Sequence, residues 1–428
     1  MKRIFIIASL AIMAVGCQKT EIQNEIQNQI GFSTETGKMT RAIVQNGEYF
    51  TDQPFAVYAY GWQNISSLTP TEAPVMDNVK IVPTGTTTDG ITTYTWKSET
   101  GAYYWPNDPR TTLNFYAYSP SVGTSKTHKE LNGTVSHFER ATATNNTSGQ
   151  TGFVLKDYVH YNKYVDFMVT TPVVGATYSA TDPNYLVAGE SAGTVPVVFN
   201  HQMTQVRFNV TTNDVYPGIE FEVQNITLKN IDNKGTYTNT SLTHEYHTPA
   251  AATEDGEGEE TTTSFKHGSW ATSKTTDNGA TTTYQVFPAT KTEGAIFDGE
   301  ADTESVVTLK NAAGTDLNSL ASMTTTGVTM IPQTINAAIT TPTLGEDSYA
   351  AETTGQLFMI TYKVSGTGVA TETVTKHVPF KVGNTNVANW GVNQQITYTV
   401  KIGLNEIYFE PSVATWDPTT GETYEFQQ

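Results

Sequence analysis

The sequence has a single cysteine and few charged residues. One cysteine excludes disulfides within the chain, thiolate zinc sites and CxxC redox chemistry. Charged residues make up 15% of the chain, against roughly 25% in an average globular protein. Lys and Arg total 24 and Asp and Glu total 42, which gives a formal net charge of −18. Because such a chain repels phosphate backbones, we expect no nucleic-acid partner.

Catalytic motifs are also missing, since the sequence contains no HExxH, no P-loop and no GxGxxG that opens a helix. Gly189–Gly193 matches the GxSxG pattern around Ser191. A nucleophile elbow needs a helix directly after the serine, but a β-branched segment containing Pro196 follows here. We therefore expect no enzyme activity and no cofactor, and an esterase using Ser191 is the weaker alternative.

Metal-binding patterns are equally weak. His244 and His247 are three residues apart, but their surroundings are not helical, so the two rings would not share a helix face. The acidic run Glu254–Glu260 lacks the DxDxDG spacing that arranges carboxylates around calcium. The sequence therefore predicts no metal site and an exposed acidic loop.

Aromatic residues make up 11% of the 428 residues, with 22 Tyr and 18 Phe, and threonine is frequent. Threonine and aromatic side chains favour strands, and the length suits two or three domains. Val206, Phe208 and Val210 alternate with Arg207 and Asn209, as expected for a half-buried strand. Many short strands without βαβ spacing predict an all-β fold of two tandem antiparallel β-sandwich domains.

The apolar patterns of three further segments predict which residues share a face or where a strand is irregular. Phe55, Val57 and Ala59 are expected on one face, and so are Ile396, Tyr398, Val400 and Ile402. The apolar parity of 219–228 shifts after Val223, which indicates a β-bulge. A Gly- and Pro-rich stretch at 172–195 suggests a boundary between domains at 42–194 and 195–428.

Aromatic residues cluster between residues 94 and 105. This cluster consists of Tyr94, Trp96, Tyr103, Tyr104 and Trp105. Such side chains either stack on sugars or fill the core of a sandwich, and the core is the favoured interpretation.

The N-terminus has the organisation of a bacterial lipoprotein signal. Met1–Arg3 is basic, and Ile4–Val15 is apolar but too short to span a bilayer as a helix. Ala14–Cys17 resembles a lipobox, and it contains the only cysteine. We therefore interpret 1–17 as a signal peptide and Cys17 as the lipidated residue, which two acyl chains would anchor to the membrane.

Several short motifs, in this order along the chain, resemble those of the fimbrillin (Mfa-like) family of Bacteroidales, the subunits of type V pili. They are the lipobox at Cys17, Gln29–Phe32, Thr40–Ala42, Phe115–Pro120, Val198–Met203 leading into Val206–Phe208, Met330–Gln333, Trp390–Asn393 leading into Ile396–Tyr398, and Val413–Trp416. The family fold is similar to two tandem β-sandwiches, in agreement with the strand pattern.

The resemblance implies export to the outer membrane as a lipoprotein, followed by cleavage between Arg41 and Ala42. Lys38 is an alternative site for a trypsin-like protease. Residues 18–41 would then be a propeptide whose strand, around Ile30 and Phe32, fills a slot until cleavage. A strand from another pilin subunit would replace it by β-augmentation, which seals an otherwise aggregation-prone edge.

By family analogy the replacing donor strand lies near the C-terminus. The first candidate is Glu406–Thr415, with Ile407, Phe409 and Val413 on one face, and the second is Thr423–Phe426. The first segment is alternatively a resident edge strand. The mature subunit would be a stalk or tip component of an extracellular pilus, a homopolymer or heteropolymer, with a host or bacterial surface ligand as a further partner. The competing hypothesis is a permanently lipidated surface protein that binds glycan or host protein.

Overall fold

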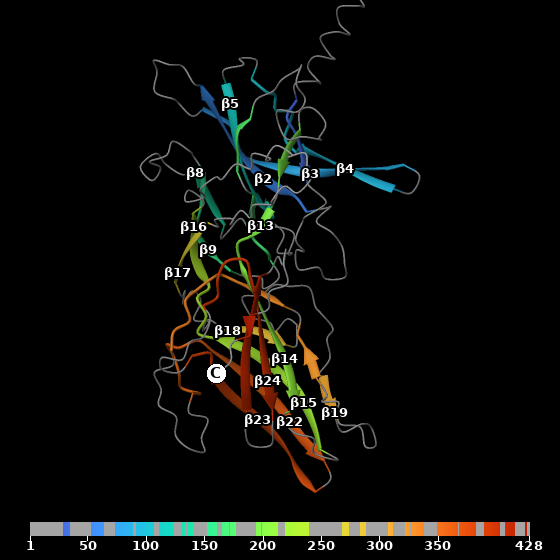
Figure 1. Cartoon of the computed structure of the whole chain (residues 1–428), viewed down its shortest axis with the longest axis vertical. Helices are drawn as coiled ribbons and strands as arrows, with labels where there is room; N and C mark the ends of the chain where they lie inside the picture. The colour runs from blue at the N-terminus through green and yellow to red at the C-terminus, as the bar shows by residue number, and fades with distance from the viewer. Residues whose placement is uncertain are drawn as a thin grey trace, which may run out of the picture. The chain divides into compact units, whose positions relative to one another are not determined.

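The computed structural model of the chain consists of β-strands and connecting segments (Figure 1). It describes residues 29–34, 53–63, 73–88, 91–106, 111–123, 131–132, 136–140, 152–160, 165–170, 172–176, 194–197, 199–212, 219–238, 268–273, 283–287, 307–310, 322–325, 327–337, 349–366, 368–381, 389–402, 407–415 and 424–425. Within these ranges every regular element is a strand, and none is a helix able to cross a membrane. The predicted all-β fold is confirmed.

The described residues divide into two compact units. Those within Met1–Met39, Phe50–Tyr118 and Thr170–Phe199 form the first, and those within Ser119–Val169 and Asn200–Gln428 form the second. The last switch between units, after Phe199, lies close to the boundary predicted at 194–195. The prediction had assigned Ser119–Val169 to the first domain. The structure places this segment in the second unit, because its longest strand pairs with a strand that begins at Lys234.

The first unit is built on one nine-stranded sheet in the order β12-β1-β4-β3-β2-β5-β10-β13, with β11 also paired to β5. Its strands are β1 (Gly31–Thr34), β2 (Phe55–Gln63), β3 (Ala73–Thr88), β4 (Ile91–Ser98), β5 (Thr111–Ser119), β10 (Met168–Thr170), β11 (Val173–Ala176), β12 (Thr194–Val197) and β13 (Phe199–His201). The boundary between the units falls within β10 and β13.

This sheet folds back over its own core. Four steps separate β1 from β5 in the sheet order, which corresponds to roughly 19 Å in a flat sheet. The ring centroids of Phe32 on β1 and Phe115 on β5 are nevertheless 6.1 Å apart. Phe55 on β2 and Phe199 on β13 lie three steps apart and are 5.4 Å from centroid to centroid. The strands therefore curve into two facing layers, as in a sandwich.

The second unit contains two larger sheets. One has six strands: β14 (Thr204–Thr212), β20 (Ser322–Thr324), β21 (Val328–Met330), β24 (Gln394–Ile402), β25 (Ile407–Thr415) and β26 (Tyr424–Glu425). The other has five: β15 (Ile219–Lys229), β18 (Thr283–Phe287), β19 (Val307–Lys310), β22 (Leu357–Gly366) and β23 (Val369–Pro379). Phe208 on β14 and Phe358 on β22 meet between them, with 5.0 Å between ring centroids.

Smaller sheets complete the second unit. A four-stranded sheet contains β8 (His137–Arg140), β9 (Phe153–Val159), β16 (Lys234–Thr238) and β17 (Ser269–Ser273). A parallel pair is formed by β6 (Val122–Gly123) and β7 (Leu131–Asn132). Pairing of β9 with β16 joins residues about eighty positions apart, which explains why Ser119–Val169 belongs to this unit.

The predicted strand patterns hold in the second unit. Val206, Phe208 and Val210 are buried, whereas Arg207 and Asn209 are only partly buried. The four apolar residues of β24 are fully buried, and the register of β15 shifts between Val223 and Asn225. In the first unit, burial of β2 extends beyond the predicted face of Phe55, Val57 and Ala59. Residues 55–60 are all buried, because β2 is an inner strand covered on both faces.

Candidate functional site

The short strand β1 lies between β12 and β4. It runs parallel to β12 in four registered positions, from Gly31↔Thr194 to Thr34↔Val197. On its other side it pairs antiparallel with β4 at Phe32↔Trp96. Just before β1, the Ile30 backbone N–H donates to the Tyr103 carbonyl at 2.8 Å. The segment containing Ile30 and Phe32 is therefore hydrogen-bonded into the sheet of the first unit.

The two apolar side chains of this segment face the core. Ile30 and Phe32 are each 5% exposed, whereas Gly31 between them is only partly buried. The Phe32 ring makes edge contacts with Phe55 at 5.8 Å and Phe115 at 6.1 Å between centroids. Burial of each such side chain contributes ~1.5–3 kcal/mol. The site is thus a slot that accepts two apolar side chains spaced two residues apart.

Strand β12 depends on β1 for its place in the sheet. Among the described strands, β12 ends the sheet order and reaches the rest of the sheet through β1. Its residues Val195 and Val197 are buried, at 0% and 1% exposure. Without β1, backbone groups of β12 and β4 would lose their partners and apolar surface would face water, which is an aggregation hazard.

The C-terminal candidates form β25 and β26. Strand β25 pairs antiparallel with β24 over nine positions, from Gln394↔Thr415 to Ile402↔Ile407. In this register Ile407, Phe409 and Val413 lie opposite Ile402, Val400 and Ile396, which are fully buried. On the outer side β26 pairs with β25 at two positions only, Ser412 and Val413. In this structure β25 is therefore a strand of the second unit, one step from the sheet edge.

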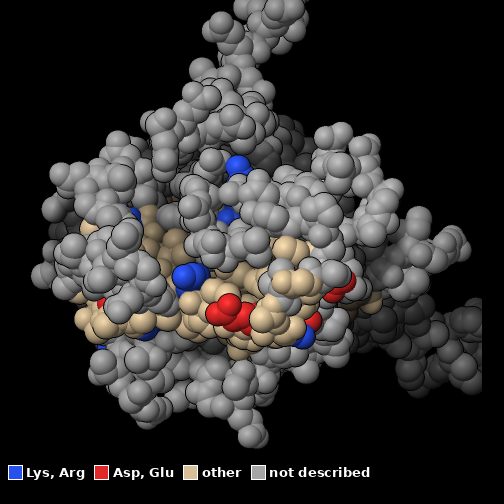
Figure 2. Space-filling view, turned by 90° about the horizontal axis from the view of Figure 1, so that it is seen from below, with Lys and Arg blue, Asp and Glu red and all other residues tan. Residues whose placement is uncertain are grey.

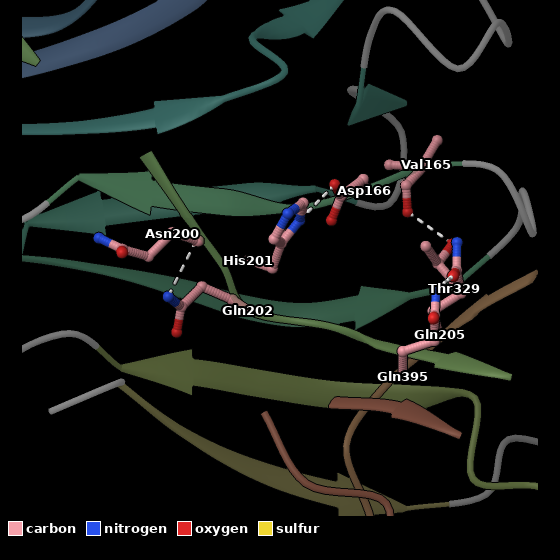
Figure 3. A network of polar contacts seen from close by, with 8 residues as sticks. All are labelled: Val165, Asp166, Asn200, His201, Gln202, Gln205, Thr329 and Gln395. Atoms are coloured by element: carbon pink, nitrogen blue, oxygen red, sulfur yellow. Dashed lines mark hydrogen bonds and ion pairs between the residues drawn. The ribbon is translucent and has the colours of Figure 1, made fainter. Parts of the chain in front are cut away.

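A polar junction, formed by Asp166, His201, Gln202, Tyr237 and Trp270, lies within the second unit, and Figure 3 shows the first three of these residues. His201 Nδ1 donates to Asp166 Oδ2 at 2.6 Å, and their side chains are 0% and 6% exposed. Gln202 accepts from the Tyr237 hydroxyl at 3.2 Å, and its carbonyl accepts from Trp270 Nε1 at 2.8 Å. The two bonds of Gln202 connect it, within the second unit, to β16 and β17 of the four-stranded sheet.

The polar junction consists of residues that the sequence reasoning did not single out as functional. Its only sequence signal is the polar run Asn200–Gln202 between the apolar residues Phe199 and Met203. Because the Asp–His pair is enclosed, it is shielded from any substrate. Its hydrogen bonds satisfy groups that would be costly to bury alone, so the junction stabilises the fold.

His160 forms a second buried polar contact in the same unit. Its Nε2–H donates to the Thr329 carbonyl at 2.7 Å, and Nδ1 accepts from the Tyr158 hydroxyl at 3.1 Å. Burial lowers the pKa of His160 to about 4, although the bond to Thr329 opposes the shift. The ring is therefore neutral at physiological pH.

Charged side chains are few on one described face of the molecule. On the face shown in Figure 2, the described residues are mostly uncharged, with a few separated acidic and basic side chains. Among the exposed ion pairs, that of Lys234 Nζ with Asp157 Oδ1 at 3.0 Å lowers the pKa of Asp157 through a hydrogen bond and charge attraction. No group of three metal-ligating side chains occurs in the parts of the chain that the structure describes.

The aromatic cluster divides between core and surface. Trp96 and Trp105 are buried at 4% and 2% exposure, and the Trp105 ring contacts Phe115 at 5.7 Å. Tyr104 is 48% exposed. The tryptophans are thus core residues, in line with the favoured interpretation.

Several predicted positions lie outside the described residues. They are Cys17, Lys38, Arg41, Ala42, Ser191, His244, His247 and the acidic run 254–260. Of the predicted site, the structure describes Ile30 and Phe32 fully and the backbone of Ile407, Phe409 and Val413.

The family model described as "Fimbrillin-like" matches residues 40–300, which is more than half of the chain. The chain belongs to the fimbrillin-like family. Membership of this family points to a structural protein without enzyme activity. No curated protein matches the chain.

Solved structures resemble the fimbrillin-like chain over most of its length. A fimbrial protein from Bacteroides vulgatus is 15% identical, with 91% of this chain and 99% of that chain covered and a TM-score of 0.45. The tip fimbrial protein Mfa3 from Porphyromonas gingivalis, with C-terminal truncation, is 10% identical, with 85% and 94% covered and a TM-score of 0.28. A fimbrial assembly protein from Parabacteroides distasonis is 8% identical, with 93% and 99% covered and a TM-score of 0.29. At these values, family membership rests on the family model.

Proposed function

We propose that this fimbrillin-like chain is a structural or adhesive pilus subunit, in the stalk or at the tip. It is exported as a lipoprotein through Cys17 and cut between Arg41 and Ala42. It then assembles by strand exchange with other pilin subunits, and it moves from the outer membrane to an extracellular pilus. A stalk or tip role is favoured over an anchor, because an anchor gains nothing from releasing its lipid.

The observation that carries this proposal is the position of β1. A segment that precedes Arg41 by only a few residues lies between two strands of the first unit and buries Ile30 and Phe32. Cleavage at Arg41 separates that strand covalently from the rest of the chain. Its departure would open a slot flanked by β12 and β4, and a strand from another subunit would be stabilised by entering it.

The energetics suit a durable polymer. Two buried side chains contribute roughly 3–6 kcal/mol together, at ~1.5–3 kcal/mol each. Ladder hydrogen bonds along the four registered positions with β12 add ~0.5–1.5 kcal/mol each. A donor strand with these features would dissociate slowly. The durability of such a fibre would therefore be mainly kinetic.

The test is limited treatment of the purified precursor with an arginine-specific protease, followed by intact mass measurement and electron microscopy. We expect loss of residues 1–41 and then filaments. Arg41→Ala is expected to block both steps, whereas Lys38→Ala serves as the matched control and is expected to leave them intact. Cleavage and leader release without filaments, in the presence of other subunits, would contradict strand exchange.

The alternative function, a permanently lipidated binding protein, can be distinguished from a pilus subunit by determining the N-terminal residue of the chain isolated from cells. A surface-exposed chain starting at Ala42 supports the pilus subunit. A chain that starts at a diacylated Cys17 supports permanent anchoring, and Cys17→Ala then identifies the lipid by the loss of acyl mass.

A further inference from the structure

We infer that strand β23 is an interaction surface for a second copy of this chain. Two copies of β23 pair antiparallel about a two-fold axis at Val374, and Glu372 of each copy lies opposite Lys376 of the other. The inference is independent of the proposed strand exchange, because β23 and its sheet belong to the second unit.

Strand β23 lies at the end of the five-stranded sheet. Among the described strands the order is β18-β15-β22-β23, so β23 pairs with β22 along one side only. From Glu372 to Pro379 this pairing keeps one register without a bulge. Thr373 and Thr375 on this strand are exposed. The strand therefore presents a regular edge, of the kind that pairs with another strand unless it is covered or interrupted.

The backbone groups of Thr373 and Thr375 point outward from this edge. In an antiparallel ladder, alternate residues direct both their N–H and their C=O groups to the neighbouring strand. Directly after β23, the Phe380 N–H donates to the Gln356 carbonyl at 3.0 Å, in the register of the ladder. The even-numbered residues of 372–378 therefore face β22. Thr373 and Thr375 direct their N–H and C=O groups to the other side.

The sequence of β23 is complementary to itself about Val374. Residues at equal distances from a two-fold axis lie opposite each other, so Thr373 of one copy lies opposite Thr375 of the other. Their outward groups then form hydrogen-bonded pairs on both sides of the axis. Glu372 and Lys376 also come to lie opposite each other twice, and opposite charges at such positions stabilise a strand pair.

Neighbouring registers lack this match. An axis at Glu372 or at Lys376 would place like charges opposite each other, which is destabilising. An axis at Thr373 or at Thr375 would place both charged residues opposite apolar ones. Of these five registers, only the one centred on Val374 pairs each charge with its opposite.

The same register extends the hydrophobic core across the interface. Val374 lies opposite the fully buried Tyr362 and packs, partly buried, against the core of the second unit. At the axis it meets Val374 of the other copy, so apolar surface at the edge is removed from water. An unrelated strand would meet the two charges of β23 without matching them, and charges at a sheet edge oppose such pairing. A copy of this chain is therefore the favoured partner.

The test is sedimentation velocity of the purified full chain over a concentration series at low salt. Every sample carries Cys17→Ala, so that acyl chains cannot cause association. The chain with native β23 is expected to dimerise. Glu372→Lys and Lys376→Glu, each alone, place like charges opposite each other at both positions and are expected to weaken the dimer about 5- to 30-fold. An equal mixture of these two variants restores opposite charges and is expected to associate as the native strand does.

A second variant tests the backbone pairing. Thr373→Pro removes one outward N–H and no bond to β22, and Pro379 already occupies an outward position of the same strand. This variant is expected to lose the dimer while its circular dichroism stays that of the native fold.

Three results would overturn the inference. They are a native chain that stays monomeric up to about 1 mM, equal association of the native chain and both charge variants, and a mixture of the charge variants that stays as weak as each alone. None of them bears on cleavage at Arg41 or on filament formation, so the proposed function is judged separately.

Discussion

The two units of this chain differ in where their strands come from. The first unit includes β1, which lies before the predicted cleavage site, and the described part of β12 joins its sheet through that strand. The second unit draws all its described strands from residues after Ser119. Its main core, from Val206 to Ile402, is closed between two sheets of one continuous region. Loss of the leader would therefore affect one unit and spare the other.

This difference shows how one chain can combine a stably closed unit with a unit that can exchange a strand. A sandwich of two stacked sheets is stabilised by many buried contacts and needs no outside strand. A sheet that includes a short strand near a protease site stays closed only while that strand remains. The contrast can be tested by weakening each unit separately, before and after cleavage.

The largest effect is expected for Phe208→Ala in the second unit. The Phe208 ring packs against Phe358 and Tyr398, with centroids at 5.0 and 5.5 Å, and the side chain is fully buried. We expect a loss of about 3–5 kcal/mol in the free energy of unfolding. Urea unfolding should give the same loss in the precursor and in the cleaved chain. Thr373→Ser, on the exposed edge strand β23, is the control and should change stability by less than about 0.5 kcal/mol.

A smaller effect, present only before cleavage, is expected for Phe32→Ala. Loss of this ring removes contacts with Phe55 and Phe115 and should destabilise the first unit of the precursor by about 3 kcal/mol. The measurement is urea unfolding followed by tryptophan fluorescence, since Trp96 and Trp105 lie in this unit. After cleavage at Arg41 the variant and the native chain become identical, so the difference should vanish. A Phe32→Ala defect that persists in the cleaved chain would show that the leader stays bound.

Much of the strand structure could be predicted from the alternation of apolar and polar residues. The alternation around Phe208, the four apolar residues of β24 and the bulge after Val223 were all predicted, because each depends on local sequence. The same alternation puts Ile30 and Phe32 on one face. It does not identify the neighbours of that strand, Trp96 and Val195, which lie far away in sequence.

What the sequence did not predict depends on long-range pairing. The pairing of β9 with β16 moves Ser119–Val169 into the second unit, and no local composition marks it. The Asp166–His201 pair joins residues 35 positions apart, and neither lies in a recognisable motif for this contact. Burial of β2 on both faces likewise follows from its inner place in the sheet. Such features are set by tertiary packing, which overrides local preference.

The smallest effect that we predict is an acid sensitivity of the second unit through His160. Its pKa is about 4 in the folded chain because of burial, against about 6.5 when unfolded. Between these values the unfolded chain binds a proton that the folded chain does not, so stability falls as pH drops from 6.5 towards 4. At pH 5 the expected loss is about 2 kcal/mol, since one unit corresponds to about 1.4 kcal/mol. Urea midpoints of the native chain and His160→Gln, measured from pH 7 to 5, should converge as pH falls. His377→Gln, on the edge strand β23, controls for the removal of a histidine. If the urea midpoints of the native chain and His160→Gln change in parallel with pH, His160 does not cause the acid sensitivity. Any acid sensitivity of the second unit would then come from other titratable groups.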